Sequence, residues 1–357
     1  MSNANTAASE LLHQIQAECS RPWTLMEVCG GQTHALLRHG IDQLLPETIT
    51  LIHGPGCPVC VTAMDRIDQA LALAQDPGVI LCTYGDMLRV PGSGGRDLLS
   101  LRASGADVRI VYAPLDVLRL ARQHPERKVV FFAVGFETTA PATALLAQQT
   151  MEAGLTNLLL LVAHVRVAPV LDQLLSDPAC AVQGVLAAGH VCTVLGDAEL
   201  KDLVQQHQRP VVITGFTAEE LLQGILHCVR QLESGRHHLE NAYASAVQSG
   251  GNPGAQRLLA QVFEPVDMSW RGLGLIRAGG YQLRPPFDRL AVQPGHGMST
   301  NSDATASDAC PSGLVLQGLL RPSQCPSFGT RCTPDAPMGA PMVSSEGACA
   351  AYYRYQR

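Results

Sequence analysis

The sequence predicts an α/β protein in which helices cover parallel sheets, followed by a loop-rich C-terminal region that carries cysteines. Short apolar runs alternate with segments of helical periodicity through the middle of the chain, which is typical of parallel strands with helices on both faces. A length of 357 residues exceeds one ordinary hydrophobic core and predicts two or three domains. Past residue 240 glycine, proline and serine become frequent and the periodicity fades.

Several apolar runs are candidate strands, with candidate helices between them. Strands are expected at residues 48–52, 79–83, 108–112, 129–134, 157–162, 184–187 and 210–214, and helices at 61–74, 115–123, 139–151, 169–175 and 218–232. Functional loops of parallel sheets lie at the carboxyl ends of the strands. Because residues 54–60, 84–89, 135–139, 188–190 and 215–216 all follow predicted strands, we expect them to line one cleft.

Composition excludes several classes of protein. Hydrophobic residues make up 46% of the chain, charged residues 16%, and the net charge is −6, which favours neither disorder nor a nucleic-acid partner. No apolar run reaches the roughly 18 residues of a membrane span, and residues 1–10 lack the regions of a signal peptide. We therefore expect a cytoplasmic protein whose 12 cysteines stay reduced unless they bind metal or act as a redox pair.

Cys57 and Cys60 are separated by two residues and come after a predicted strand and a Gly-Pro-Gly turn. Helical periodicity follows, so both thiols are expected near a helix N-terminus, where unpaired N–H groups favour a thiolate. The spacing fits a thioredoxin-like redox pair, half of a zinc site, or a chance occurrence.

Cys29 stands beside two glycines and precedes Gln32, Thr33 and His34. The three cysteines of residues 29–60 and this histidine could converge on one soft metal, because thiolates select zinc, copper(I) and iron-sulfur or low-spin iron centres. Structural zinc remains an alternative, although a fourth thiol at Cys-x-x-Cys spacing is missing.

Four further cysteines lie in the C-terminal region: Cys310, Cys325, Cys332 and Cys349. Each has a proline- or glycine-rich setting, and loops with little hydrophobic core of their own usually need a disulfide or a bound metal to stabilise them. Four thiolates could bind zinc or an iron-sulfur cluster, and their spacing does not separate the two.

Five motifs occur in order along the chain. They are Cys-Gly-Gly-Gln-Thr-His at 29–34, His-Gly-Pro-Gly-Cys-Pro-Val-Cys at 53–60, Gly-Asp-Met-Leu-Arg-Val-Pro-Gly at 85–92, Gly-Phe-Glu-Thr-Thr-Ala-Pro at 135–141 and Met-Val-Ser-Ser-Glu-Gly-Ala-Cys-Ala-Ala-Tyr-Tyr at 342–353. From about residue 26 to the C-terminus, the chain resembles the HypD family of hydrogenase maturation factors.

The resemblance implies two Rossmann-like parallel-sheet halves that face a cleft, and a loop-rich C-terminal iron-sulfur domain. The predicted division is an N-terminal helical segment at 1–25, a first α/β domain with Cys29 and the Cys-x-x-Cys pair at 26–125, a second α/β domain at 126–235, and an iron-sulfur cluster domain at 236–357.

The function that the resemblance implies is assembly of the Fe(CN)2CO unit of [NiFe]-hydrogenases, on a metallocofactor scaffold with redox activity. HypD-like proteins form a complex with the small chaperone HypC and hold one iron, which carries CN and CO ligands, between the partners. They accept cyanide from HypE, whose thiocyanate is made with HypF. The resemblance also implies a monomer within a heterodimer.

Site residues are carried over from the resemblance. Cys29 is the expected thiolate on the iron, Cys57 and Cys60 are expected to cycle between dithiol and disulfide, and Gln32 and Thr33 are expected beside the bound iron unit. The expected ligands of a [4Fe-4S] cluster are Cys310, Cys325, Cys332 and Cys349.

Three polar residues have two readings each. His34 is expected either to hydrogen-bond the cyanides or shuttle a proton, or to be a structural hydrogen-bonder. Glu137 is expected either to orient a thiol or to cap the helix that begins near residue 139. Asp86 is expected either to serve the cleft or to pair with Arg89.

The chain departs from the family pattern at Ala188, Thr217 and Pro341, and Cys310 lacks the expected Cys-x-Cys-Gly setting, which leaves its role as a ligand open. Two other functions remain. A thiol-disulfide oxidoreductase with a [4Fe-4S] cluster would use Cys57 and Cys60 but leaves Cys29 without a role. A structural zinc protein would explain the C-terminal cysteines but not a nucleophile-like pair at a helix start.

Overall fold

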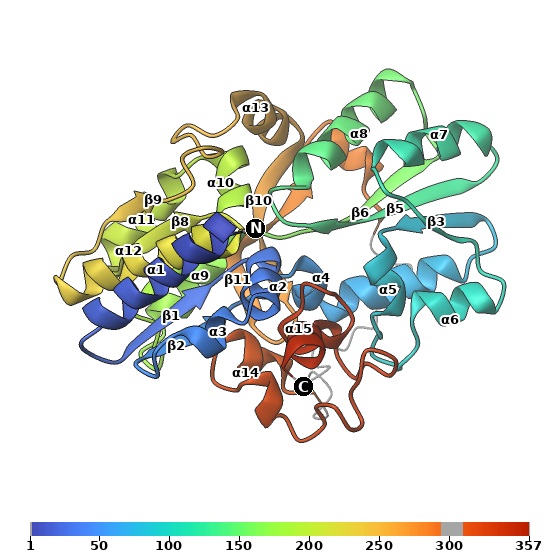
Figure 1. Ribbon diagram of the computed structural model, residues 1–357. Coiled ribbons are helices and arrows are strands. Elements are labelled where there is room, and N and C mark those ends of the chain that lie inside the picture. Colours follow the sequence, from blue (N-terminus) through green and yellow to red (C-terminus); the bar gives the residue numbers. More distant parts are fainter. Residues whose placement is uncertain (1, 294–309, 357) are drawn as a thin grey trace.

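The computed structural model describes residues 2–293 and 310–356 and confirms an α/β protein with parallel sheets. A five-stranded sheet has the order β2-β1-β7-β8-β9, and a four-stranded sheet has the order β4-β3-β5-β6. Neighbouring strands are parallel throughout both sheets. Figure 1 shows the five-stranded sheet at the left, the four-stranded sheet at the right, and the C-terminal segment below and between them.

The strands are short and mostly buried. The five-stranded sheet contains β1 (Trp23–Glu27), β2 (Ile49–His53), β7 (Gly184–Ala188), β8 (Val211–Thr214) and β9 (Leu239–Asn241). The four-stranded sheet contains β3 (Val79–Thr83), β4 (Val108–Ile110), β5 (Lys128–Gly135) and β6 (Leu158–His164). An antiparallel ribbon is formed by β10 (Phe263–Trp270) and β11 (Gly274–Leu283).

Helices connect the strands and cover the sheets. They are α1 (Ser2–Glu18), α2 (Gly30–Arg38), α3 (Ile41–Leu44), α4 (Pro58–Val61), α5 (Met64–Ala74), α6 (Leu98–Ala103), α7 (Leu115–Gln123), α8 (Ala140–Glu152), α9 (Val167–Ser176), α10 (Gly189–Leu195), α11 (Ala198–His207), α12 (Ala218–Glu233), α13 (Pro253–Val262), α14 (Ser312–Leu316) and α15 (Ala348–Tyr355). Short 3-10 helices are η1 (Gly85–Arg89), η2 (Phe287–Leu290), η3 (Pro322–Gln324) and η4 (Ala340–Met342).

Most predicted elements are confirmed within one or two residues at their ends. The strand at 79–83 and the helix at 115–123 have the predicted bounds. The helix expected at 61–74 is divided, because α4 ends at Val61 and α5 begins at Met64. Strand β1 escaped prediction because its sequence, Trp-Thr-Leu-Met-Glu, mixes polar and apolar residues. The α13 helix and the β10–β11 ribbon fall where the periodicity fades.

The chain order of the strands does not follow the predicted domain boundaries. β3 pairs with both β4 and β5, across the boundary at 125/126. β1 pairs with β7 within the five-stranded sheet, although residues in register, such as Leu25 and Gly184, stand 159 positions apart in the sequence. The chain thus starts in the five-stranded sheet, crosses to the four-stranded sheet and returns, which strand patterns alone do not reveal. β9 extends the five-stranded sheet beyond the boundary at 235/236.

Both sheets are covered on both faces, as predicted for continuous apolar strands. In the five-stranded sheet, Leu25 and Leu186 pack among α1 and α12, while Val185 and Ile213 pack on the opposite side among α9 and α11. In the four-stranded sheet the strands β3 and β5 likewise divide their side chains between two core clusters. The carboxyl ends of the strands stay uncovered by these helices and carry the loops described below.

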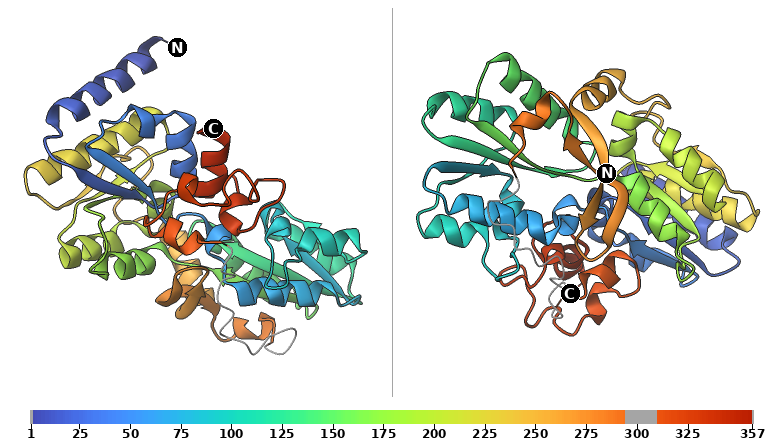
Figure 2. Two further views of the ribbon diagram at one scale, coloured as in Figure 1. Left: turned by 90° about the horizontal axis from the view of Figure 1, so that it is seen from below. Right: turned by 180° about the vertical axis from the view of Figure 1, so that it is seen from behind.

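The C-terminal segment contacts the beginning of both thiol-bearing loops. Helix α15 packs against α2, and η4 packs against α4. The left view of Figure 2 shows this segment beside the N-terminal part of the chain. Among the described residues, no helix combines the length and the apolar character that crossing a membrane requires.

Candidate functional site

Two loops that carry thiols leave neighbouring strands side by side. Glu27 at the end of β1 is in register with His53 at the end of β2. The Gly54 N–H donates to the Glu27 carbonyl at 2.8 Å, and the Gly30 N–H donates to the Gly56 carbonyl at 2.9 Å. A side chain at Gly56 would place its Cβ 2.3 Å from the Cys29 nitrogen, so glycine allows the two loops to touch.

Cys29 directly precedes α2 and is half-buried as a whole residue. Burial raises the pKa of the Cys29 thiol to about 12, helped by the charges of Glu27 and Glu346 and opposed by the backbone N–H groups of Gln32 and Gly31. The thiol is therefore protonated until a metal or another electrophile replaces the proton.

The side chains of Gln32 and Thr33 bond to protein groups. Gln32 donates from Nε2 to the carbonyls of Ala187 and Thr214 at 3.2 and 3.1 Å, which ties α2 to the ends of β7 and β8. Its Oε1 is buried and has no hydrogen-bond partner in the described part of the chain. Thr33 donates its hydroxyl to Glu27. Gln32 and Thr33 thus lie near Cys29 because all three stand in or next to the first turn of α2.

His34 points to the C-terminal segment. Its Nδ1 lies 3.3 Å from the Ser345 carbonyl, and its Nε2 lies 3.1 Å from the Tyr355 hydroxyl. The two rings pack edge to face, with centroids 5.2 Å apart. Both ring nitrogens are engaged, which favours the structural reading of His34.

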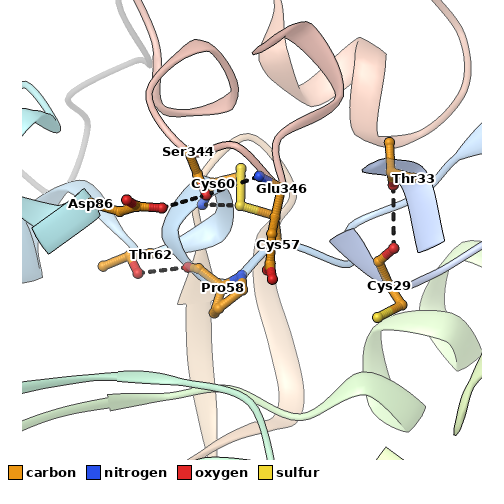
Figure 3. The surroundings of a disulfide bond; sticks show 9 residues. All are labelled: Cys29, Thr33, Cys57, Pro58, Cys60, Thr62, Asp86, Ser344 and Glu346. Atoms are coloured by element: carbon orange, nitrogen blue, oxygen red, sulfur yellow. Dashed lines mark hydrogen bonds between the residues drawn. A yellow bond between two sulfur atoms is a disulfide. The ribbon is translucent and has the colours of Figure 1, made fainter. Parts of the chain in front are cut away.

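Cys57 and Cys60 form a disulfide, and the prediction that they lie at a helix start is confirmed. Cys57 is the N-cap of α4, and its sulfur accepts the Cys60 N–H at 3.2 Å. The two side chains are 3% and 0% exposed, and Ala340 of η4 belongs to the same core cluster. Figure 3 shows the disulfide between the Asp86–Ser344 pair on one side and Cys29 on the other.

Ser344 and Glu346 bring the C-terminal segment to the same place. Ser344 donates its hydroxyl to Asp86 Oδ2 at 2.8 Å and accepts the Glu346 N–H at 3.3 Å (Figure 3). Asp86 therefore does not pair with Arg89, which instead donates to the Pro334 carbonyl. A Cβ on Gly30 would lie 2.5 Å from the Cβ of Glu346, so this segment rests directly on the start of α2.

The four C-terminal cysteines line one small, largely apolar cavity. Its walls contain Cys310, Cys325, Cys332 and Cys349 together with Val315, Phe328, Pro341 and Met342. Burial raises the pKa of the Cys310 and Cys349 thiols, and the other three thiols of the set raise that of Cys349 further. Cys310, whose role was left open, is thus grouped with the others.

Glu137 is fully buried after β5, and the structure shows a third arrangement for it. Its Oε1 accepts the Val167 N–H at 2.9 Å, so it caps α9 and not the helix that begins at Ala140. Its Oε2 has no partner among residues 2–293 and 310–356. Burial raises the Glu137 pKa to about 7. Glu137 lines a cavity of about 30 Å³ together with Ala188 and Cys192.

The positions that depart from the family pattern lie at element ends or in cavity walls. Ala188 ends β7 and lines the Glu137 cavity. Thr217 is the N-cap of α12, and its hydroxyl accepts the Glu220 N–H at 3.2 Å. Pro341 lines the cavity of the four cysteines.

The suggestion that three cysteines and His34 converge on one metal is wrong for the described residues. No group of three or more histidine, cysteine or acidic side chains in this part of the chain could hold a single ion. The thiols of Cys310, Cys325, Cys332 and Cys349 line one cavity.

Two buried residues that our sequence analysis did not select belong to this site. Glu27 accepts the Cys29 N–H at 2.9 Å, and His53 Nδ1 lies 2.8 Å from Glu27 Oε1. His53 directly precedes Gly54 and directly follows the predicted strand at 48–52, which is the signal that could have identified it. Glu27 stands two residues before Cys29 at the end of a strand that was not predicted, so no local signal marked it.

Comparison with known proteins accounts for the five motifs. The family model HypD, described as the Hydrogenase formation hypA family, matches residues 6–356. The chain belongs to the HypD family. It is 44% identical over 359 residues to the hydrogenase maturation factor HypD of Rhizobium leguminosarum bv. viciae, covering 98% of this chain and 93% of the relative.

Further HypD relatives show the same coverage. The hydrogenase maturation factor HypD of Escherichia coli strain K12 is 45% identical over 349 residues, covering 98% of this chain and 93% of the relative. That of Azotobacter vinelandii is 44% identical over 358 residues, covering 98% and 94%. Membership of the HypD family supports a role in hydrogenase maturation.

Proposed function

We propose that this protein is a scaffold and redox protein that assembles the Fe(CN)2CO unit of a [NiFe]-hydrogenase. It would act in the cytoplasm as a monomer within a heterodimer with a HypC-like chaperone, and accept cyanide from HypE, with HypF upstream. The observation that carries the proposal is the contact between the Cys29 loop and the Cys57–Cys60 loop, with the cavity of four cysteines behind them.

Cys29 is the thiol proposed to hold the iron that is being assembled. A thiolate is a soft ligand of the kind that low-spin iron with cyanide ligands requires. Cys29 is a half-buried residue at the start of α2, and an iron and a second thiolate from the partner would meet there. Because the pKa of Cys29 is raised, its thiol carries a proton, and iron must displace that proton when it binds.

Cys57 and Cys60 are proposed to exchange the electrons of cyanide transfer. Reductive cleavage of a thiocyanate R–S–CN takes up two electrons and two protons and releases R–SH and HCN. Oxidation of the Cys57–Cys60 dithiol to the disulfide releases two electrons and two protons, so the two reactions balance. HCN then gives up its proton as cyanide binds iron. The contact between Gly56 and the Cys29 backbone keeps both steps in one place.

The C-terminal cavity fits the [4Fe-4S] cluster that the family implies. Four thiols line its wall, and the remaining lining is mainly apolar. Cys310, Cys325, Cys332 and Cys349 would hold the cluster, which when bound there supplies single electrons. Ala340 packs beside the disulfide while the adjacent Pro341 and Met342 line the cavity, so η4 is a shared wall.

His34 and Glu137 are proposed to have structural roles, in which each holds two elements of the fold together. His34 joins α2 to α15 through Tyr355, and Glu137 caps α9 at the return of the chain to the five-stranded sheet. Neither residue makes a hydrogen bond to a thiol in the described part of the chain.

A thiol-disulfide oxidoreductase with a [4Fe-4S] cluster is the alternative. It requires a protein disulfide to reach Cys57 or Cys60, yet these side chains are 3% and 0% exposed. Burial of the pair therefore favours electron exchange with neighbouring groups of the same complex.

The test is an infrared spectrum in the metal cyanide and carbonyl stretching region, recorded on the protein purified without oxygen together with its HypC-like partner. We expect cyanide and carbonyl bands in the wild type and in a Cys180→Ser control, and none in Cys29→Ala. The iron-sulfur absorbance should persist in all three. Silent wild-type spectra from a protein that contains iron and sulfide would favour the oxidoreductase, and bands retained in Cys29→Ala would refute the role of Cys29.

A further inference from the structure

A buried carboxylate and a buried histidine stand where both thiol loops begin. Glu27 is fully buried and is the last residue of β1. It accepts the Cys29 N–H at 2.9 Å and the Thr33 hydroxyl, and its Oε1 lies 2.8 Å from His53 Nδ1. Three donors from three positions thus converge on one carboxylate.

His53 contacts the elements of all three thiol sites. Through Glu27 it reaches the Cys29 loop, and it stands at the end of β2, four residues before Cys57. Its ring packs edge to face on Tyr352, with centroids 5.5 Å apart, and Tyr352 follows Cys349 by one turn of α15. Its Nε2 is buried and has no partner in the described ranges 2–293 and 310–356. The ring is therefore fixed by the Glu27 bond and the Tyr352 contact.

A carboxylate buried at this depth keeps its position only while its donors are in place, because an unsatisfied buried charge is costly. The side chain of Cys29 makes no capping bond at the start of α2. Its backbone is fixed by two side chains, because its N–H donates to Glu27 at 2.9 Å and its carbonyl accepts the Thr33 hydroxyl at 3.3 Å. Loss of the His53 donor would free the Glu27 side chain to turn. Such a turn would break the bond to Cys29.

We infer that His53 is a positioning residue that acts through Glu27 to hold the Cys29 loop, and through Tyr352 to align the cysteine-bearing C-terminal segment with that loop. The purpose of this alignment, to present the Cys29 thiol to iron, rests on the proposed function. The inferred geometry itself does not depend on iron.

The perturbation is His53→Leu, which removes the Nδ1 donor and retains an apolar side chain of similar size. His53→Asn is the conservative variant, because its amide nitrogen can take the place of Nδ1. His207→Leu is the control on other elements, since the His207 side chain is 8% exposed and its Nε2 lies 2.8 Å from the carboxylate of Asp172. Glu27→Gln is a second variant that keeps the shape of the carboxylate.

The first readout needs no iron. The rate of Cys29 alkylation by iodoacetamide is measured by mass spectrometry on the metal-free full chain under anaerobic conditions. We expect alkylation about tenfold faster or more in His53→Leu and Glu27→Gln, because each loses a hydrogen bond to a charged group and the loop opens more often. His53→Asn should restore the wild-type rate within about twofold, and His207→Leu should leave it unchanged even if it lowers stability.

The second readout is the infrared spectrum of the complex with the HypC-like partner. We expect weaker and broader cyanide bands in His53→Leu, and wild-type bands in His53→Asn. Equal alkylation rates in wild type, His53→Leu and Glu27→Gln would overturn the inference, as would a His207→Leu variant that matches His53→Leu. If the wild type lacks bands but His53→Leu still accelerates Cys29 alkylation, the proposed function fails and the positioning role stands.

Discussion

Replacement of Gly56 by alanine tests whether close backbone contact holds the two thiol loops together. The new Cβ would stand 2.3 Å from the Cys29 nitrogen and 2.5 Å from both the Cys29 Cα and the Val28 carbonyl carbon. All three are backbone atoms, which cannot turn away as a side chain can. Ordinary contact begins near 3.4 Å, so the loops must separate by about 1 Å.

The expected cost follows from two opposing effects. Overpacking of this kind destabilises by about 1–3 kcal/mol, while alanine in place of glycine restricts the unfolded chain and returns about 0.4–1 kcal/mol. Gly94→Ala isolates the second effect, because Gly94 has ordinary backbone angles and no atom within 4 Å of its ideal Cβ. We expect the free energy of unfolding of Gly56→Ala to lie about 1–3 kcal/mol below that of Gly94→Ala.

The assay is urea unfolding followed by circular dichroism, with Cys29 alkylation on the same samples and one fixed redox buffer. Gly56→Ala should unfold at lower urea and react faster at Cys29, whereas Gly94→Ala should match or slightly exceed the wild type in stability. The reasoning is refuted if the two variants agree within about 0.5 kcal/mol and Cys29 reacts at the wild-type rate in both.

Two further predictions concern buried groups. The folded state holds the Glu137 proton to about pH 7, whereas the unfolded chain releases it near 4.5, so raising the pH between these values favours unfolding. Glu137→Gln should remove this loss of folding free energy, which amounts to up to about 3 kcal/mol. The variant should therefore be more stable than the wild type above pH 7 but not below pH 4.5. Urea titrations in which both proteins show the same dependence of stability on pH would contradict this prediction. Cys310→Ser should lower iron and sulfide per chain, while Cys180→Ser should leave both unchanged. A full complement of iron and sulfide in Cys310→Ser would exclude Cys310 as a ligand.

The sequence predicted local structure well and the pairing of distant strands poorly. Continuous apolar runs such as 79–83 identify strands buried on both faces, and the glycines of 54–56 identify a turn at a strand end. The same runs do not say which sheet a strand joins, because 129–134 and 184–187 are equally apolar yet belong to different sheets. Physical contact between β1 and β7 depends on packing that no local pattern records.

Candidate side chains were predicted where the backbone alone decides their place, and missed where orientation matters. Cys57 and Cys60 lie at a helix start that follows a strand and a turn, and the strand, the turn and the helix each have a local sequence signal. His34 is close to Cys29 in sequence, yet its position along α2 directs it to Tyr355. Glu137 caps α9, which follows the next strand, because the ends of neighbouring parallel strands share one edge of the sheet.

The interleaved path of the chain explains why the C-terminal cysteines come last. The disulfide lies on the segment that crosses from β2 to β3, and thus from one sheet to the other. The C-terminal segment contacts both sides of this crossing, since Ser344 bonds to Asp86 after β3 and Glu346 rests on Gly30 after β1. Its loops have little regular structure of their own, so these contacts align the four thiols. We therefore expect the cavity of four cysteines to form only after both sheets have folded, and a cofactor placed there to join two sheets that the chain connects through Cys57 and Cys60.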